Sequence, residues 1–151
     1  KRKHQELLAM FIDLDGFKQI NDIYGHQIGD TVLREIGQRI GAWARRDTDS
    51  VARVGVDEFV VLTENTIDDE FLAARAALLI ERINAPISVG GTSVRVGASL
   101  GAARFPQDAS NADELLHAAD RAMYEAKKAG KNCLRLASAA SAPNADSSAA
   151  T

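Results

Sequence analysis

The sequence contains few of the residues that mark several large classes of protein. Its single cysteine, Cys133, excludes an internal disulfide. With no signal-peptide pattern at its start, the chain is expected to work in a reducing, cytoplasmic compartment. No apolar run approaches the roughly 20 residues that a membrane-spanning helix needs. The formal net charge of −3 gives no basic surface for nucleic acid, so we expect no nucleic-acid partner.

The remaining composition is ordinary for one globular domain. The chain has 151 residues, of which 46% are hydrophobic and 26% charged, enough to bury a single core. We expect a domain over residues 1–136, cut from a longer protein, because its first strand begins within a few residues of Lys1. Residues 137–151 contain only Ala, Ser, Pro, Asn, Asp and Thr and are expected to be a disordered tail or linker.

Hydrophobic periodicity and turn residues predict the secondary structure. The predicted elements are a strand over 8–13, a helix over 17–24, a helix over 31–44, a hairpin over 50–63, a helix over 68–84, a hairpin turning at Gly90-Gly91, a helix over 111–129 and a strand over 132–136. Consecutive hairpins require a sheet that is at least partly antiparallel. One sheet with helices on a face accounts for this order. The predicted fold class is therefore α+β, ferredoxin-like rather than doubly wound.

Acidic residues stand at two predicted strand ends. Asp13 and Asp15 end the first strand, and Asp57 and Glu58 lie at the tip of the first hairpin. If the two strands are neighbours, these carboxylates meet, and like charges at short range need a cation to neutralise them. Oxygen ligands suit Mg²⁺, which can organise phosphoryl transfer. The alternative is that the acids are ordinary turn residues.

Lysines gather at the end of the last predicted helix. The four-residue spacing of Lys127 and Lys131 allows both to point the same way and reach one phosphate group. The alternative is that these lysines, with Lys128, only complement the helix dipole. Asn21 and Asp30 also have sufficient structural roles, Asn21 in the turn before Gly25 and Asp30 as N-cap of the helix at 31–44.

Three segments together resemble one family. "FIDLDGFKQINDIYGHQIGDTVL", "RVGVDEFVVL" and "ADRAMYEAKKAGKN" follow one another between Phe11 and Asn132. They resemble the GGDEF family, the diguanylate cyclase domains of bacterial signalling. The resemblance implies a nucleotidyl-cyclase-type fold, with a central, mostly antiparallel sheet flanked by helices. It also implies condensation of two GTP into cyclic di-GMP across a homodimer, with Mg²⁺ or Mn²⁺, and an attached sensory or phosphodiesterase domain.

The resemblance implies a role for each matching residue. The metal ligands would be Asp13, the backbone carbonyl of Leu14 and Asp57. Asp57 would also assist the attacking ribose hydroxyl, and Glu58 belongs to the same catalytic signature. GTP would be bound by Asn21 and Asp30 at the guanine edge and by Lys18, Lys127 and Lys131 at the phosphates. Arg46 and Asp49 match the inhibitory site that binds cyclic di-GMP.

The chain departs from the family pattern in three places. The family's opening segment is missing, and Lys131 stands where arginine is usual, which keeps the charge but loses the bidentate fork. More seriously, Val56 replaces the second signature glycine. Two-residue hairpin turns commonly need positive φ, where a non-glycine residue costs about 1–2 kcal/mol and a β-branched one is an outlier. The isopropyl group also fills space where a nucleotide approaches.

These departures favour one of three hypotheses. We predict a degenerate domain that binds GTP or cyclic di-GMP and regulates an attached effector, with weak or no cyclase activity. An active diguanylate cyclase is the first alternative, and a structural interaction module without a ligand is the second. The presence of Asp13, Asn21, Asp30 and Asp57 together argues against that second alternative.

Overall fold

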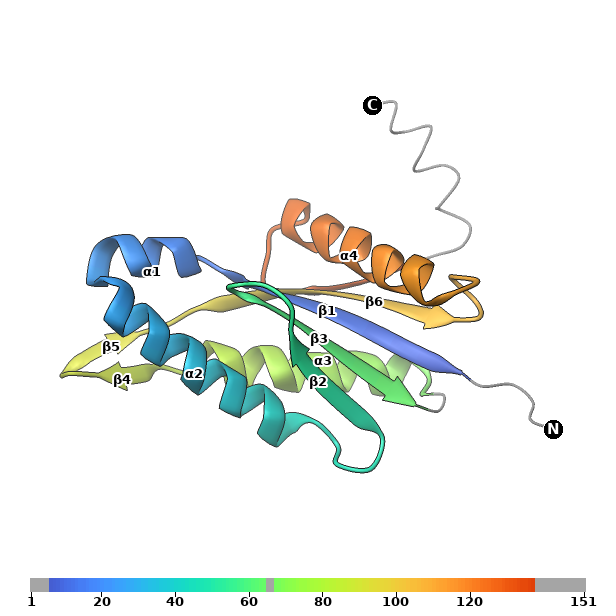
Figure 1. The fold of residues 1–151 in the computed structure, drawn as a ribbon, viewed down its shortest axis with the longest axis horizontal. Coiled ribbons are helices and arrows are strands. Elements are labelled where there is room, and N and C mark those ends of the chain that lie inside the picture. The colour runs from blue at the N-terminus through green and yellow to red at the C-terminus, as the bar shows by residue number, and fades with distance from the viewer. Residues whose placement is uncertain (1–5, 65–66, 138–151) are drawn as a thin grey trace.

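The structure is a computed structural model that describes residues 6–64 and 67–137. Within these ranges the chain forms a five-stranded sheet, a two-stranded sheet and four helices (Figure 1). The elements follow in the order β1 (Leu7–Asp15), α1 (Phe17–Tyr24), α2 (His26–Trp43), β2 (Asp49–Arg53), β3 (Glu58–Glu64), α3 (Asp69–Asn84), β4 (Ile87–Val89), β5 (Thr92–Val94), β6 (Gly97–Phe105), α4 (Ala112–Lys128) and β7 (Leu134–Leu136). No helix within the described ranges combines the length and the hydropathy needed to cross a membrane.

The main sheet has the strand order β2-β3-β1-β6-β7. β1 pairs antiparallel with both β3 and β6, β2 pairs antiparallel with β3, and β6 and β7 run parallel. The predicted α+β class with a mostly antiparallel sheet is thereby confirmed. The turn at Gly90-Gly91, with φ of 55° and 81°, is also present, but its hairpin β4–β5 forms a separate two-stranded sheet. The long strand β6 begins after it, at Gly97.

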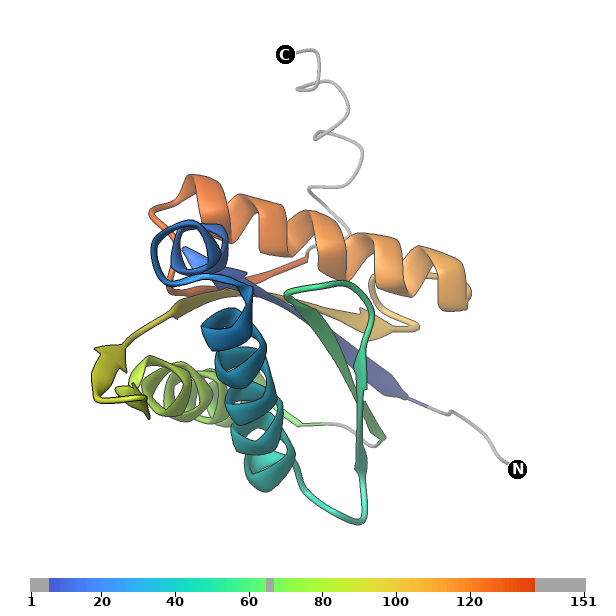
Figure 2. The same ribbon diagram turned by 60° about the vertical axis from the view of Figure 1, so that its left-hand side comes forward.

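Helices cover both faces of the main sheet, so the expectation of one covered face was wrong. α4 lies over β6 and β1 on one face, and α2 and α3 lie on the other (Figure 2). The reason is visible in β6, where residues on both faces of the strand are buried, as expected of a strand covered on two sides. Along β1 the side chains alternate, so Ile12 and Leu14 face α2 and α3 while Ala9 and Phe11 face α4.

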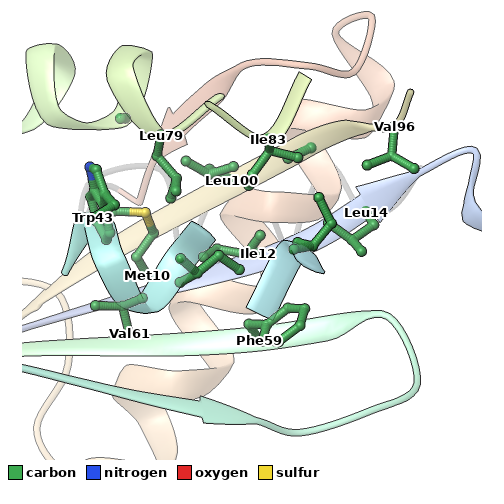
Figure 3. Packing of buried hydrophobic residues seen from close by; sticks show 14 of the residues in the cluster. Met10, Ile12, Leu14, Trp43, Phe59, Val61, Leu79, Ile83, Val96 and Leu100 are labelled. Carbon is green, nitrogen blue, oxygen red and sulfur yellow. The ribbon is translucent and has the colours of Figure 1, made fainter. Parts of the chain in front are cut away.

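The larger core lies between the sheet and the helices α2 and α3. Figure 3 shows strand residues such as Met10, Ile12 and Leu100 meeting Trp43 of α2 and Leu79 of α3. On the opposite face the contact is closer. A Cβ placed on Gly101 of β6 would meet the backbone of α4 at Ala119, Ala122 and Met123. The backbone of α4 therefore lies directly against β6 at residues 119–123, one turn before the end of the helix.

The helix α2 begins at His26, five residues before the predicted start, so Asp30 is not its N-cap. One residue, Gly25 with φ of 93°, separates α1 from α2. Asp30 is exposed on the second turn of the helix. Gly29, which directly precedes the predicted N-cap, lies inside the helix and makes room for Asn21, because a Cβ at Gly29 would overlap the Asn21 carboxamide.

The domain boundaries stay a prediction. Of the predicted tail, residues 138–151 lie outside the described residues. Ala137 is described, and its N–H donates a hydrogen bond of 2.7 Å to the Ala102 carbonyl of β6. Residues 1–5, which precede the first strand, also lie outside the described residues.

Candidate functional site

The pairing of β1 with β3 brings the two predicted acidic strand ends together. The register places Asp13 opposite Glu58. One position further on, the Leu14 N–H donates a hydrogen bond of 3.1 Å to the Asp57 carbonyl. The acidic tip of the hairpin therefore lies against the end of β1, as the sequence predicted.

The Leu14 carbonyl also faces this tip. In an extended strand the N–H and C=O of one residue point to the same edge, and an antiparallel hydrogen-bonded pair normally exchanges both bonds. Within the described residues, however, no N–H of the loop over 54–57 donates to the Leu14 carbonyl. The side chain of Leu14 is buried in the core on the other face (Figure 3). Its carbonyl oxygen is thus left beside Asp13 and Asp57.

Asp13 lies in an unfavourable place for a negative charge. Its side chain is only 14% exposed. Burial raises the pKa of Asp13 to about 6, and the nearby carboxylates of Asp57 and Glu58 raise it too, while Lys127 opposes the shift. A group of acids in this arrangement attracts any available cation.

Lys127, from the last turn of α4, supplies one such cation. Its Nζ lies 3.4 Å from Asp13 Oδ2 and 3.3 Å from Asp15 Oδ1. Burial lowers the pKa of Lys127, but Asp13 and Asp15 more than compensate, so the pKa lies above its ordinary value and the side chain is charged. Asp15 lies on the same face of β1 as Asp13, and both carboxylates contact Lys127.

Asp15 is held by a network that the sequence did not predict. It accepts hydrogen bonds from the Ser99 hydroxyl at 2.8 Å and from the Asn132 N–H at 3.0 Å. The Asn132 carboxamide in turn accepts from the Ala98 N–H and pairs reciprocally with Asn84, over 3.0 and 3.1 Å. The one sequence signal is that Asn132 lies two residues after Gly130, just past the end of the helix, and asparagine tolerates its observed φ of 52°.

Among the described residues, the other two predicted phosphate-binding lysines, Lys18 and Lys131, make no side-chain hydrogen bond or ion pair with this network. α4 ends at Lys128, so the helical spacing of Lys127 and Lys131 does not hold and the predicted shared direction has no helical basis. Lys131 has φ of 66°, and its N–H donates 2.9 Å to the Ala126 carbonyl. Lys18 is exposed on the first turn of α1.

The predicted guanine-reading pair is brought together at the junction of α1 and α2. The Asn21 carboxamide lies against Gly29, the residue before Asp30. Asn21 is half-buried and Asp30 is exposed. The Asn21 amide therefore lies beside the residue that directly precedes Asp30, and its guanine-reading role stays a prediction.

The expected strain at Val56 is absent. The Val54 N–H donates 2.9 Å to the Glu58 carbonyl, so the loop is wider than a two-residue turn. Among the described non-glycine residues only Lys131 and Asn132 have positive φ, and Val56 does not. The Val56 side chain is 63% exposed. At the first glycine, Gly55, a Cβ would lie 2.8 Å from Glu58 Oε1, which can rotate away, and 3.3 Å from Glu58 Cβ, so there is little spare room.

The predicted inhibitory pair is divided between surface and interior. Arg46 is exposed, whereas the Asp49 side chain is only 2% exposed. Asp49 accepts hydrogen bonds from the Arg45 N–H at 2.8 Å and the Thr48 hydroxyl at 3.1 Å. Burial raises its pKa, but these hydrogen bonds and the Arg45 guanidinium bring the pKa of Asp49 below its usual value. A ligand would reach Arg46 directly but would compete with Arg45 for Asp49.

The donor set at the acidic tip fits a magnesium ion bound together with a nucleotide. Among the described residues no three His, Cys, Asp or Glu side chains lie close enough to hold a metal by themselves. Mg²⁺ does not require three, because it usually keeps waters and takes one or two carboxylates plus phosphate oxygens. Asp13, Asp57 and the Leu14 carbonyl supply two carboxylates and one neutral oxygen at the same edge.

Comparison with known proteins finds similar sequences over most of the chain. A family model described as "Diguanylate cyclase, GGDEF domain" matches residues 1–133. MucR of Pseudomonas aeruginosa, named a bifunctional diguanylate cyclase/cyclic di-GMP phosphodiesterase, is 43% identical over 131 residues, which are 87% of this chain and 19% of MucR. TpbB of the same species, named a diguanylate cyclase, is 42% identical over 137 residues, 89% of this chain and 31% of TpbB.

The fold agrees with the sequence comparison. The crystal structure of the GGDEF domain of Pseudomonas aeruginosa TpbB superposes with a TM-score of 0.83 at 41% identity, covering 88% of this chain and 83% of that one. The chain thus spans most of a solved GGDEF domain but less than a third of the full-length relatives named above.

Proposed function

The chain belongs to the GGDEF family of diguanylate cyclase domains, and on this premise we propose that it binds GTP in cyclic di-GMP signalling while forming little or no cyclic di-GMP. The observation that carries the GTP-binding part is the edge at which Asp13, the Leu14 carbonyl and Asp57 converge, with Lys127 beside them. These are the oxygen donors and the cation that a metal-bound triphosphate needs.

Different residues of the site would bind the metal ion, the phosphates and the guanine base. Asp13, Asp57 and the Leu14 carbonyl would hold Mg²⁺ or Mn²⁺, which supplies charge neutralisation for the triphosphate when bound. Lys127 would contact the phosphates, with Lys18 and Lys131 as further cations. Asn21 and Asp30 would read the guanine edge, one as amide donor and acceptor and the other as acceptor.

Weak turnover follows from the space that Val56 takes at the tip. Val56 is exposed in the loop directly before Asp57, and its isopropyl group would crowd a nucleotide bound at that tip. Asp57 would both bind metal and assist the attacking ribose hydroxyl, with Glu58 in the same catalytic signature. Displacing a metal-binding group such as the Asp57 carboxylate by about 1 Å costs on the order of 10²-fold in rate. GTP binding would therefore survive a change that abolishes turnover.

An active cyclase is the second candidate, and the loop conformation favours it. Because Val56 is not in the left-handed region, valine imposes no backbone strain there, and only its bulk opposes catalysis. The two candidates differ in what Val56→Gly does. If the domain binds GTP with little turnover, the substitution raises cyclic di-GMP synthesis at least tenfold. If the domain is an active cyclase, the substitution changes synthesis little.

The test measures cyclic di-GMP formed from GTP and Mg²⁺ by the chain fused to a dimerising segment, since each reaction needs two protomers. Calorimetry with GTP and Ca²⁺, which should support little turnover, measures binding separately. Robust synthesis by the wild type would refute the first candidate. Failure of the wild type to bind GTP would refute the proposal as a whole.

Cyclic di-GMP is the second proposed ligand, bound through Arg46 and Asp49. We further propose that the chain works as a homodimer in the cytoplasm, as part of a longer protein with a sensory or phosphodiesterase domain. Two facts support a longer protein: MucR is named both a diguanylate cyclase and a phosphodiesterase, and the chain spans only 19% of MucR and 31% of TpbB. Arg46→Ala should abolish cyclic di-GMP binding in calorimetry. Equal binding by the variant and the wild type would remove this assignment.

A further inference from the structure

The Lys127 ammonium lies beside Asp13, in the position where a bound metal cation would otherwise balance the charge of that carboxylate. We propose that Lys127 is a built-in counter-ion of Asp13, which it leaves for the nucleotide phosphates when a divalent cation takes its place. The inference rests on the proposed function, because it assumes that cation and GTP bind at the acidic tip. It goes beyond that function by giving Lys127 two alternative partners and by coupling the two ligands.

The electrostatic reason lies in the surroundings of Asp13. Its side chain is 14% exposed and lies near the carboxylates of Asp57 and Glu58, which disfavour its charge. The Lys127 Nζ, 3.4 Å from Asp13 Oδ2, offsets this cost while no other cation is bound. A divalent ion on the same carboxylate supplies twice the charge, and it repels an ammonium held a few ångströms away. The two cations therefore compete for Asp13.

Asp15 keeps Lys127 within reach after it leaves Asp13. The Lys127 Nζ lies as close to Asp15 Oδ1, at 3.3 Å, as it does to Asp13. Asp15 is itself 10% exposed and fixed by the Ser99 hydroxyl and the Asn132 N–H. Lysine has a flexible four-carbon stem and three donors, so it can turn about this second anchor. Asp15 is thus a positioning residue for Lys127.

The exchange couples the two ligands. A cation on Asp13 releases one of the two contacts of Lys127, and the ammonium then has a second free donor to offer to a phosphate oxygen. A phosphate on Lys127 in turn weakens its hold on Asp13. Each ligand therefore raises the affinity of the other by the same factor, as linkage requires.

The experiment measures Mn²⁺ binding in the absence of any nucleotide. The full 151-residue chain is freed of metal, and free Mn²⁺ is followed by electron paramagnetic resonance during a titration. Lys127→Met removes the charge and keeps the length of the side chain. We expect this variant to bind Mn²⁺ about tenfold more tightly than the wild type, because the competing ammonium is gone.

Lys128→Met is the matched control. It makes the same change of charge on the next residue, whose side chain is 60% exposed and lies 3.8 Å from Glu125. It should change the Mn²⁺ affinity by less than about twofold, as expected for an exposed and screened charge. Circular dichroism and thermal unfolding establish that both variants are folded.

A parallel titration with GTP and no divalent metal separates this proposal from the proposed function. Lys127→Met should bind GTP more weakly than the wild type, opposite in sign to its effect on Mn²⁺. An Mn²⁺ affinity of Lys127→Met equal to or below that of the wild type, or no saturable binding by the variant, overturns the exchange. Absence of GTP binding by the wild type refutes the proposed function, while tighter Mn²⁺ binding would still support the competition for Asp13.

Discussion

Replacing Gly101 by alanine should weaken both the fold and the site. Gly101 lies on β6 beneath α4, and an added Cβ would lie 2.6 Å from the carbonyl carbon of Ala122 and closer still to atoms of Ala119 and Met123. All three obstacles are backbone, so no side-chain rotation relieves the contact. Either α4 moves outward or β6 bends.

The expected cost is large for the addition of one methyl group. Overpacking a well-packed core costs about 1–3 kcal/mol, and the backbone nature of the contact places Gly101→Ala near the upper end, at about 3 kcal/mol. The shift also reaches the site. Lys127 lies one turn beyond Met123 on the same helix, so its distances of 3.3 and 3.4 Å to Asp15 and Asp13 should lengthen.

Urea unfolding measures the loss of free energy, and Gly41→Ala is the matched control. Gly41 lies in the last turn of α2, and apart from the neighbouring backbone of that helix no atom lies within 4 Å of its Cβ position. Alanine there should stabilise the chain by up to about 1 kcal/mol, since glycine is the poorer helix former. A free energy of unfolding for Gly101→Ala within 0.5 kcal/mol of the wild type would refute the close packing of α4 on β6.

Two further predictions concern the guanine pair and the inhibitory pair. Gly29→Ala should displace the Asn21 carboxamide and lower GTP affinity at least tenfold in calorimetry, while inorganic triphosphate binds unchanged; equal losses for both ligands would contradict a guanine-reading role. Asp49→Asn should lower the free energy of unfolding by about 1–3 kcal/mol at pH 7, because it removes the charge from a buried hydrogen-bonded group. The folded-state pKa of Asp49 is depressed, so this contribution is present above the ordinary pKa of 3.8 and is lost as the pH falls through the folded value. Denaturant unfolding of both proteins from pH 7 to pH 2.5 should show the difference shrinking at the acid end, and a constant difference would show that the charge of Asp49 is not its cause.

The fold was largely predictable because its signals are local. The apolar run of β1, the Gly90-Gly91 turn and the N-caps Asp68 and Asn111 each fix an element within a few residues. The start of α2 was missed for the opposite reason. Gly29 looks like a helix boundary, and only its contact with Asn21 explains a glycine inside the helix.

The acidic tip was predictable only on the assumption that β1 and β3 are neighbours. Once they pair, Asp13 and Glu58 must meet, and the register confirms this. The network around Asp15 was not predictable, because it joins residues 84, 99 and 132, which are far apart in the sequence and carry no common motif. The conformation at Val56 was predicted wrongly because the number of residues in the loop is decided by the Val54–Glu58 hydrogen bond, which no local pattern specifies.

The order of strands makes the two proposed acidic ligands, Asp13 and Asp57, mechanically unequal. β1 is bonded to a neighbour along both edges, so Asp13 is anchored in the stiffest part of the sheet. Asp57 sits on a loop whose outer support, β2, is an edge strand bonded along one side only. If the site closes around ligands of different size, Asp57 would therefore move while Asp13 stays fixed. Changes in the β2–β3 hairpin would then alter ligand affinity without moving Asp13.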